Sequence, residues 1–189
     1  MTDPEMRAFL HPWWLAQHPD SVLVNEYGGL SEARADVAAF SEAGNHAYEI
    51  KSDHDSLRRL PSQLEAYATL FHRVTIISGP RYQAKVAALA PDWMGLVLVD
   101  ELGAITLVRA AGDNPTPPLT ARALWIAEGQ HLCRTHGLRG YSRLTSWTLP
   151  DFLHERLPAA VIEAWVLQCI RHRYPKPFGQ PGVAAKELE

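Results

Sequence analysis

The chain has few cysteines, no long apolar run and no excess of positive charge, and each absence excludes a class of protein. With 2 cysteines in 189 residues, disulfides do not hold the fold together, and a reducing, cytoplasmic setting is expected. No uncharged run of about 18 apolar residues is present, so we expect neither a membrane span nor an export signal. The formal net charge of -3 argues against coating nucleic acid by bulk charge, but it allows a local cationic groove.

The composition is that of a globular domain with an appendage. Hydrophobic residues make up 47% of the chain, which is enough for a real core. The proline-rich stretch 114–118 is typical of a linker. We therefore predict a core at 1–113, a helical C-terminal subdomain at 119–174 packed on it, and a loosely ordered tail at 175–189, which is rich in Pro and Gly.

The order of predicted elements indicates the fold class. Helical patterns alternate with short apolar runs that are typical of strands. We predict helices at 3–17, 57–71, 81–89, 120–136 and 158–173, with a shorter one after Leu149-Pro150, and strands at 21–27, 34–40, 46–52, 73–78, 95–100 and 104–110. This order predicts an α/β (α+β) fold, with a mixed β-sheet flanked by helices and a helical C-terminal appendage.

The stretch "NHAYEIKSDHDSLRRLPSQLEAY" carries the main functional signal, because its predicted strand places Glu49 and Lys51 on one face. The stretch Glu42–Asn45 is typical of a hairpin turn. With Ala43-Gly44 as the loop, Asp36 pairs with Lys51 and projects from the same face as both charged residues. The opposite face then carries core side chains, namely Val37, Ala39, Tyr48 and Ile50.

Two carboxylates and a lysine on one sheet face form a reasonable apparatus for hydrolysing a phosphodiester. Neighbouring carboxylates can share a hard divalent cation such as Mg²⁺, which prefers oxygen ligands. A lysine beside them can orient a water molecule and offset charge that builds up on a phosphate. The alternative is a solvated strand face with a surface ion pair that contributes about 0–1 kcal/mol.

The pattern resembles the PD-(D/E)XK nuclease superfamily. The sequence has Asp36, a hairpin and then Glu49-x-Lys51, with Ala35 in place of the motif's nominal proline. Gln63-x-x-x-Tyr67 is similar to the QxxxY element of the RecB-like branch. Glu26 matches an acidic residue often found upstream. The resemblance covers about residues 22–80 and is closest to small, largely uncharacterised bacterial and phage members.

This resemblance implies a restriction-endonuclease-like fold and specific residue roles. Asp36 and Glu49 would bind Mg²⁺ or Mn²⁺, joined by Glu26, and Lys51 would activate the attacking water. Gln63 and Tyr67, which share a helix face, would steady the site or a DNA phosphate. Two arginines just after the second acid are predicted phosphate contacts: Arg58 and Arg59.

We therefore expect a metal-dependent DNA nuclease, a hydrolase of phosphodiester bonds, acting in DNA repair, phage biology or defence. Endonuclease and exonuclease action both stay open, as does a homodimer. One alternative is a catalytically silent DNA-binding or scaffold protein on the same fold. Another is a hydrolase of RNA or of a phosphodiester outside nucleic acids.

Other residues that resemble functional signals are better explained by packing. Cys133 and Cys169 each precede a histidine by three residues, which would suit a zinc site between helices, but free cysteines are usually core residues. Arginines recur in the C-terminal helical segment, at positions 122, 134, 139, 143, 171 and 173 among others, and their dispersal favours a packing role over a DNA-contacting module. The tryptophans are expected to pack in the core, with a platform for stacking single-stranded DNA as the alternative.

Overall fold

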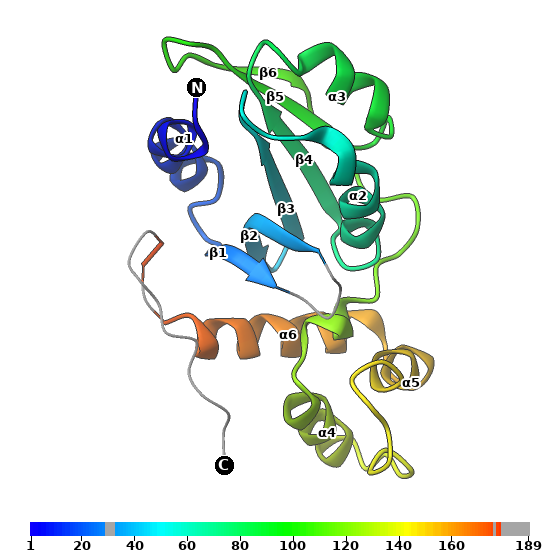
Figure 1. Ribbon diagram of the computed structural model, residues 1–189. Coiled ribbons are helices and arrows are strands. Elements are labelled where there is room, and N and C mark those ends of the chain that lie inside the picture. The colour runs from blue at the N-terminus through cyan, green and yellow to red at the C-terminus, as the bar shows by residue number, and fades with distance from the viewer. Residues whose placement is uncertain (29–32, 176, 179–189) are drawn as a thin grey trace.

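The computed structural model describes residues 1–28, 33–175 and 177–178. Within them, six strands form one mixed sheet whose spatial order follows the chain order (Figure 1). The strands are β1 (Val22–Gly28), β2 (Arg34–Ser41), β3 (Gly44–Lys51), β4 (Arg73–Ser78), β5 (Gly95–Val99) and β6 (Ile105–Arg109). β3, β4 and β5 run parallel to one another, and the other neighbouring pairs are antiparallel.

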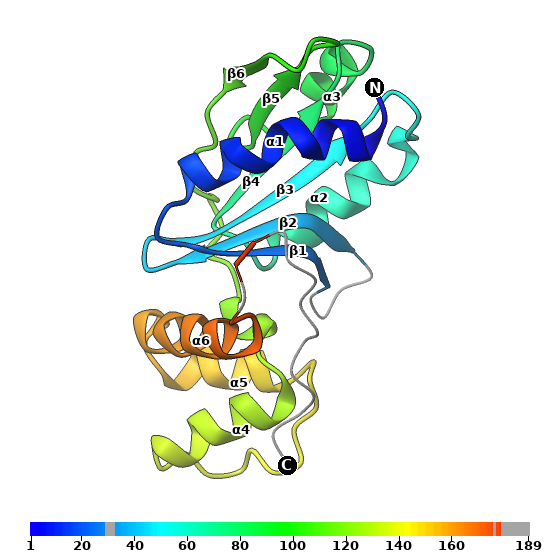
Figure 2. The same cartoon turned by 90° about the vertical axis from the view of Figure 1, so that its left-hand side faces the viewer.

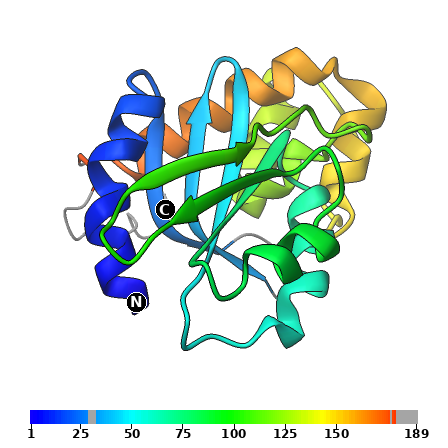
Figure 3. The same cartoon turned by 90° about the horizontal axis from the view of Figure 1, so that it is seen from above.

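Helices cover both faces of this sheet. α1 lies across one face (Figure 2), and α2 and α3 lie on the other (Figure 3). A group of C-terminal helices, α4 to α6, lies beyond the β1 edge, where α6 contacts β2 (Figure 2). The helices are α1 (Asp3–Gln17), α2 (Leu60–Ala68), α3 (Gln83–Leu89), α4 (Ile126–Thr135), α5 (Leu149–Arg156) and α6 (Ala159–Arg173), with 3₁₀ turns η1 (Leu57–Arg59) and η2 (Thr120–Ala123).

The mixed sheet, its flanking helices and the C-terminal helices confirm the predicted fold class. Successive side chains of β2 and β3 point to opposite faces of the sheet, which produces two hydrophobic layers. The layer under α1 contains Met6, Leu10 and Trp14 together with the four strand residues predicted to face the core: Val37, Ala39, Tyr48 and Ile50. The opposite layer includes Ala38 and Ala47, and it extends to buried residues of α2, α4 and α6.

The β2–β3 turn differs from the prediction. Its loop is Glu42-Ala43 rather than Ala43-Gly44, because Ser41 pairs with Gly44. The Ser41 hydroxyl accepts a hydrogen bond from the Ala43 N–H, and Gly44 adopts a φ of 106°, which favours glycine. These local features move the two-residue loop by one residue toward the N-terminus.

The predicted register was therefore wrong by two residues, but the predicted face was right. Side chains alternate with a period of two, so an even shift keeps each one on its face. Val37 pairs with Tyr48, and the next step along the strands brings Asp36 beside Glu49 rather than Lys51. The two carboxylates thus lie closer together than the sequence indicated.

In the C-terminal helices, both cysteines are buried and belong to the core, whereas His136 and His172 are exposed. The predicted helix at 120–136 is interrupted, because Leu124 is extended between η2 and α4. Apart from residues 175, 177 and 178, the predicted tail lies outside the described residues. No helix among the described residues is long and apolar enough to cross a membrane.

Candidate active site

The end of β3 buries an ion pair. The Lys51 Nζ donates a hydrogen bond of 2.6 Å to Glu49 Oε1, and the two side chains are only 7% and 3% exposed. Removing two charges from water is costly, and their attraction offsets this cost only with further hydrogen bonds. An exposed ion pair, the alternative from the sequence, is excluded by this burial.

Helix α2 supplies the further hydrogen bonds. Gln63 bridges the pair: its Oε1 accepts from Lys51 Nζ at 3.0 Å and its Nε2 donates to Glu49 Oε1 at 2.7 Å. The Tyr67 hydroxyl donates to Glu49 Oε2 at 2.5 Å. Burial and the Glu49 charge raise the pKa of Tyr67, which keeps this phenol a donor. The Gln-x-x-x-Tyr spacing therefore aims both side chains at one carboxylate.

Asp36 lies at the edge of this network. Its Oδ2 accepts a hydrogen bond of 2.7 Å from the Ile50 backbone N–H, so its side chain caps the open end of the β2–β3 ladder. Burial, followed by the nearby Glu49 charge, raises the pKa of Asp36 to about 7. Negative charge at this point is only partly neutralised, and an additional cation would be stabilised there.

Glu26 completes a row of carboxylates across three strands. Asn25 pairs with Val37 and Tyr27 with Ala35, so Glu26 lies level with Asp36 on the neighbouring strand. Glu26 has a φ of 51°, in the left-handed region that non-glycine residues rarely occupy. Such strain is typical of functional sites, where surrounding contacts maintain it.

Two arginines, neither of them predicted, bind this row. Arg7 of α1 donates to Asp3, Glu26 and Asp36 at 2.5, 2.8 and 2.9 Å, and Arg34 contacts Glu26 at 2.7 Å. The sequence contains a signal for the Asp3–Arg7 pair, which has helical i,i+4 spacing. It contains no signal that α1 lies beside the site, because that contact depends on the tertiary fold.

These side chains line one open cleft of about 1080 Å³. Glu26, Asp36, Glu49, Lys51 and Gln63 line its wall. Of the two arginines predicted to bind phosphate, Arg59 lines the cleft, whereas Arg58 is exposed and is not part of its lining. Asp55 and Trp147 are among the lining residues that were not predicted to belong here.

Across the described residues, no group of three or more His, Cys, Asp or Glu side chains is arranged to hold a metal ion. The donor chemistry nevertheless suits one, because three carboxylates line the same cleft and hard divalent cations prefer oxygen ligands. Asp36 and Glu49, with Glu26, are the residues that could hold the ion. Arg7 occupies oxygens of Asp36 and Glu26, so it would have to release them first.

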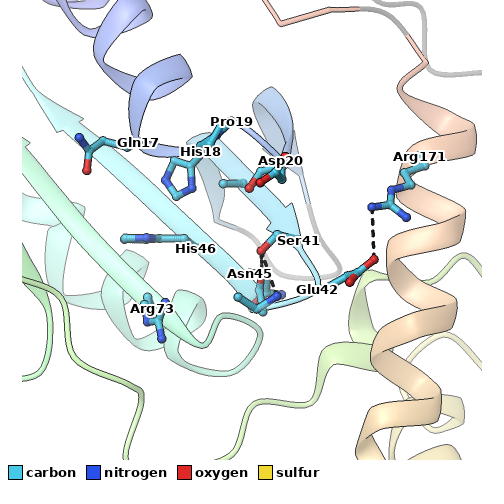
Figure 4. Close-up of a pocket in the computed structure, with 14 residues that line it drawn as sticks. Gln17, His18, Pro19, Asp20, Ser41, Glu42, Asn45, His46, Arg73 and Arg171 are labelled. Atoms are coloured by element: carbon cyan, nitrogen blue, oxygen red, sulfur yellow. Dashed lines mark hydrogen bonds and ion pairs between the residues drawn. The ribbon is translucent and has the colours of Figure 1, made fainter.

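A second pocket of about 710 Å³ opens at the amino end of β3, around His18 and His46 (Figure 4). His46 shares hydrogen bonds with Thr75 and Tyr48, and Tyr48 shares one with His18. Burial, with the charges of His18 and Arg73, lowers the pKa of His46 to about 3. His46 therefore belongs to a hydrogen-bonded cluster that is separate from the cleft of Glu49 and Lys51.

Comparison with known proteins places this architecture in a family. Residues 14–179 match the family described as Bacteriophage P4 protein cII. The chain belongs to this family. The curated relative "Protein cII" of Enterobacteria phage P4 is 33% identical over 78 residues, which is 41% of this chain. The match spans 30% of that relative's length.

Two solved structures are similar in shape to this member of the cII family. A protein of unknown function from Silicibacter pomeroyi has a TM-score of 0.49 and 20% identity, over 72% of this chain and 90% of its own. SfsA from Pyrococcus furiosus, solved in complex with Ca²⁺, has a TM-score of 0.36 and 15% identity, over 58% and 62% of the two chains. The fold assignment rests on the strand order and flanking helices rather than on these scores.

Proposed function

We propose that this cII-family protein is a metal-dependent nuclease that hydrolyses DNA phosphodiester bonds. The observation that carries the proposal is the buried network in which Lys51, Gln63 and Tyr67 all hold the Glu49 carboxylate. Replacing a buried ion pair by packed apolar side chains often costs no stability. The presence of the Glu49–Lys51 pair therefore favours a chemical role over a purely stabilising one.

Each residue has a distinct part in the proposed reaction. Asp36, Glu49 and Glu26 would hold Mg²⁺ or Mn²⁺, which when bound supplies Lewis-acid stabilisation of charge on a phosphate oxygen. Lys51 keeps a positive charge at the cleft wall, where it orients water and stabilises negative charge in the transition state. Gln63 and Tyr67 fix the Glu49 carboxylate, so that it need not reorganise during the reaction. Arg59 supports a phosphate of the substrate.

The proposed chemistry is a hydrolysis. The water oxygen bonds to phosphorus while one P–O ester bond breaks, which yields a phosphate monoester and a free hydroxyl. The proton lost by the water is balanced by the proton that the departing oxygen gains. The open cleft leaves room for a nucleic-acid strand beside the carboxylates.

A second candidate, binding of DNA without cleavage, is supported by Arg7. Its guanidinium bridges Asp36 and Glu26, the two carboxylates that a metal would need in addition to Glu49. If Arg7 is never displaced, the cleft holds a permanent internal cation in place of a metal. Metal titration therefore separates the two candidates.

The test is cleavage of supercoiled plasmid, a single-stranded oligonucleotide and an RNA of the same sequence, with Mg²⁺, Mn²⁺ or EDTA. Lys51→Ala and Asp36→Ala are compared with matched exposed controls, Lys85→Ala and Asp92→Ala. Metal-dependent cleavage that only the cleft variants lose supports the nuclease. DNA binding without cleavage by the wild type supports the second candidate, and cleavage that survives both cleft variants contradicts the site.

A further inference from the structure

The cleft has one aromatic residue on its wall that the proposed chemistry does not use. Trp147 is 59% exposed and lines the same cleft as Glu49 and Lys51. The other tryptophans of the chain are buried or half-buried. Trp147 also has no ring partner among the described residues, whereas Trp165 stacks on His131. An isolated indole beside a reactive cleft offers a free stacking face.

The backbone at Trp147 is held in place although its side chain is exposed. Thr145 accepts a hydrogen bond from the Trp147 N–H, and the Thr145 N–H donates to the Thr148 hydroxyl at 3.0 Å. Leu149 and Pro150, which follow directly, are buried at the start of α5. The indole is thus presented from an anchored turn, and a ligand would not need to order the backbone.

The chain around Trp147 is locally basic. Residues 129–150 contain arginines at positions 134, 139 and 143 but neither Asp nor Glu, in a chain whose net charge is negative. All three arginines are exposed, and none forms an ion pair with a described residue. By contrast, Arg173 is buried against Glu128 and Arg171 lies near Glu42. Arg134, Arg139 and Arg143 are therefore an unpaired set that precedes Trp147 in the chain.

We infer that Trp147 is a stacking platform for a base of single-stranded DNA, and that Arg139 and Arg143 contact the adjoining phosphates. In a duplex the faces of internal bases are covered by their neighbours, so an exposed indole selects unpaired bases. The cleft wall carries several carboxylates, which repel phosphates, and stacking supplies attraction that does not depend on charge. This inference rests on the proposed function, because it names the class of DNA that enters that cleft.

The experiment measures binding in EDTA, where no cleavage is needed. Fluorescence anisotropy compares a labelled oligothymidylate with the same strand annealed to its complement, for wild type, Trp147→Ala, Trp147→Phe and Arg139→Ala/Arg143→Ala. Trp147→Ala should weaken single-strand binding about five- to 150-fold, the value of one stacked base, and Trp147→Phe should lose less. The double arginine variant should lower the salt dependence by about two phosphate contacts.

Two controls test whether a loss of binding could come from misfolding of a variant. Arg156→Ala removes an exposed arginine that is already paired with Glu155, and it should bind like the wild type. Single-stranded DNA should also quench the intrinsic tryptophan fluorescence of the wild type, and the quenching should disappear in Trp147→Phe.

Single-strand binding that Trp147→Ala leaves unchanged, or a loss that is equal for the duplex, would overturn the inference. If the Trp147-dependent binding is found but the wild type never cleaves DNA, the nuclease proposal fails and the platform stands. If Lys51-dependent cleavage is found without Trp147-dependent binding, the nuclease proposal stands and the stacking platform is overturned.

Discussion

The two ends of β3 bury polar side chains of opposite character. At the carboxyl end, Glu49 and Lys51 are buried as charges and open onto a wide acidic cleft. At the amino end, His46 lies in a hydrogen-bonded cluster with Tyr48 and Thr75. One strand therefore contains a charged polar cluster and a neutral one, and because side chains alternate along a strand the two clusters lie on opposite faces of the sheet.

The two ends differ in what their polar groups cost the folded state, and this difference indicates which end has a functional role. Neutral hydrogen-bonded clusters satisfy their own polar atoms at little cost. A buried ion pair carries a desolvation penalty that an apolar pair would avoid. The charged end also contains the raised pKa of Asp36 and the left-handed backbone of Glu26, whereas the neutral end has neither feature. Both ends therefore contain a shifted pKa, whereas the buried ion pair and the left-handed backbone of a non-glycine residue are found at the end where we propose the chemistry.

The largest expected effect is at Lys51. Lys51→Met should reduce DNA cleavage by about 10²–10³-fold, as expected for loss of a transition-state contact. It should also lower the free energy of unfolding by about 3–5 kcal/mol, because Glu49 is left as an unpaired buried charge. The double variant Lys51→Met/Glu49→Gln should recover most of the stability but no activity. Denaturant unfolding and plasmid cleavage measure the two quantities, and recovered activity in the double variant would contradict the assigned role.

The next effect concerns Arg7. Arg7→Met should strengthen Mn²⁺ binding by roughly tenfold, because about 1.4 kcal/mol of competition for Asp36 and Glu26 is removed. Without metal the same variant should be less stable by about 1.5–3 kcal/mol, the value of a charge-assisted hydrogen bond. Isothermal titration with Mn²⁺ and thermal unfolding in EDTA check both, with Arg156→Met as the matched control. Unchanged Mn²⁺ affinity would mean that Arg7 and the metal do not share these oxygens.

A smaller effect is expected at the neutral end. His46→Phe should lower the free energy of unfolding by about 1–2 kcal/mol, because Thr75 and Tyr48 lose a half-buried hydrogen-bond partner. Cleavage by the folded variant should match the wild type, since His46 lies outside the cleft. If the cleavage rate of His46→Phe fell as far as that of Lys51→Met, the amino end of β3 would also have a functional role, and the distinction between the two ends would be wrong.

The last effect is absent at neutral pH and appears only as a difference in the pH dependence of stability in acid. The pKa of His46 is lowered from its ordinary value of 6.5 to about 3, because burial and the charges of His18 and Arg73 disfavour its protonated form. Its stabilising contribution is therefore present above pH 6.5 and is lost as the pH falls toward 3. Unfolding measured across this window should depend less steeply on pH in His46→Phe than in the wild type. The exposed variant His136→Phe is the control and should follow the wild type.

The sequence predicted the fold class and the face of every residue in the Asp36–Glu49–Lys51 group, because strand periodicity survives a register error of two residues. It did not predict which residue stands opposite Asp36, since that depended on the Ser41 hydroxyl and the φ of Gly44. Gln63 was expected to steady the site or a phosphate, and in the structure it forms hydrogen bonds with Glu49 and Lys51.

Local pattern by itself determined the strands, the α2 spacing and the grouping of acids with a lysine, because these follow from periods of two and of 3.6 residues. Only the tertiary structure decided that Arg7 crosses from α1 to bind Glu26 and Asp36, and that Trp147 reaches the cleft from the C-terminal segment. These contacts join residues far apart in the chain. Their partners are selected by how helices pack around the finished sheet, and no local pattern encodes that packing.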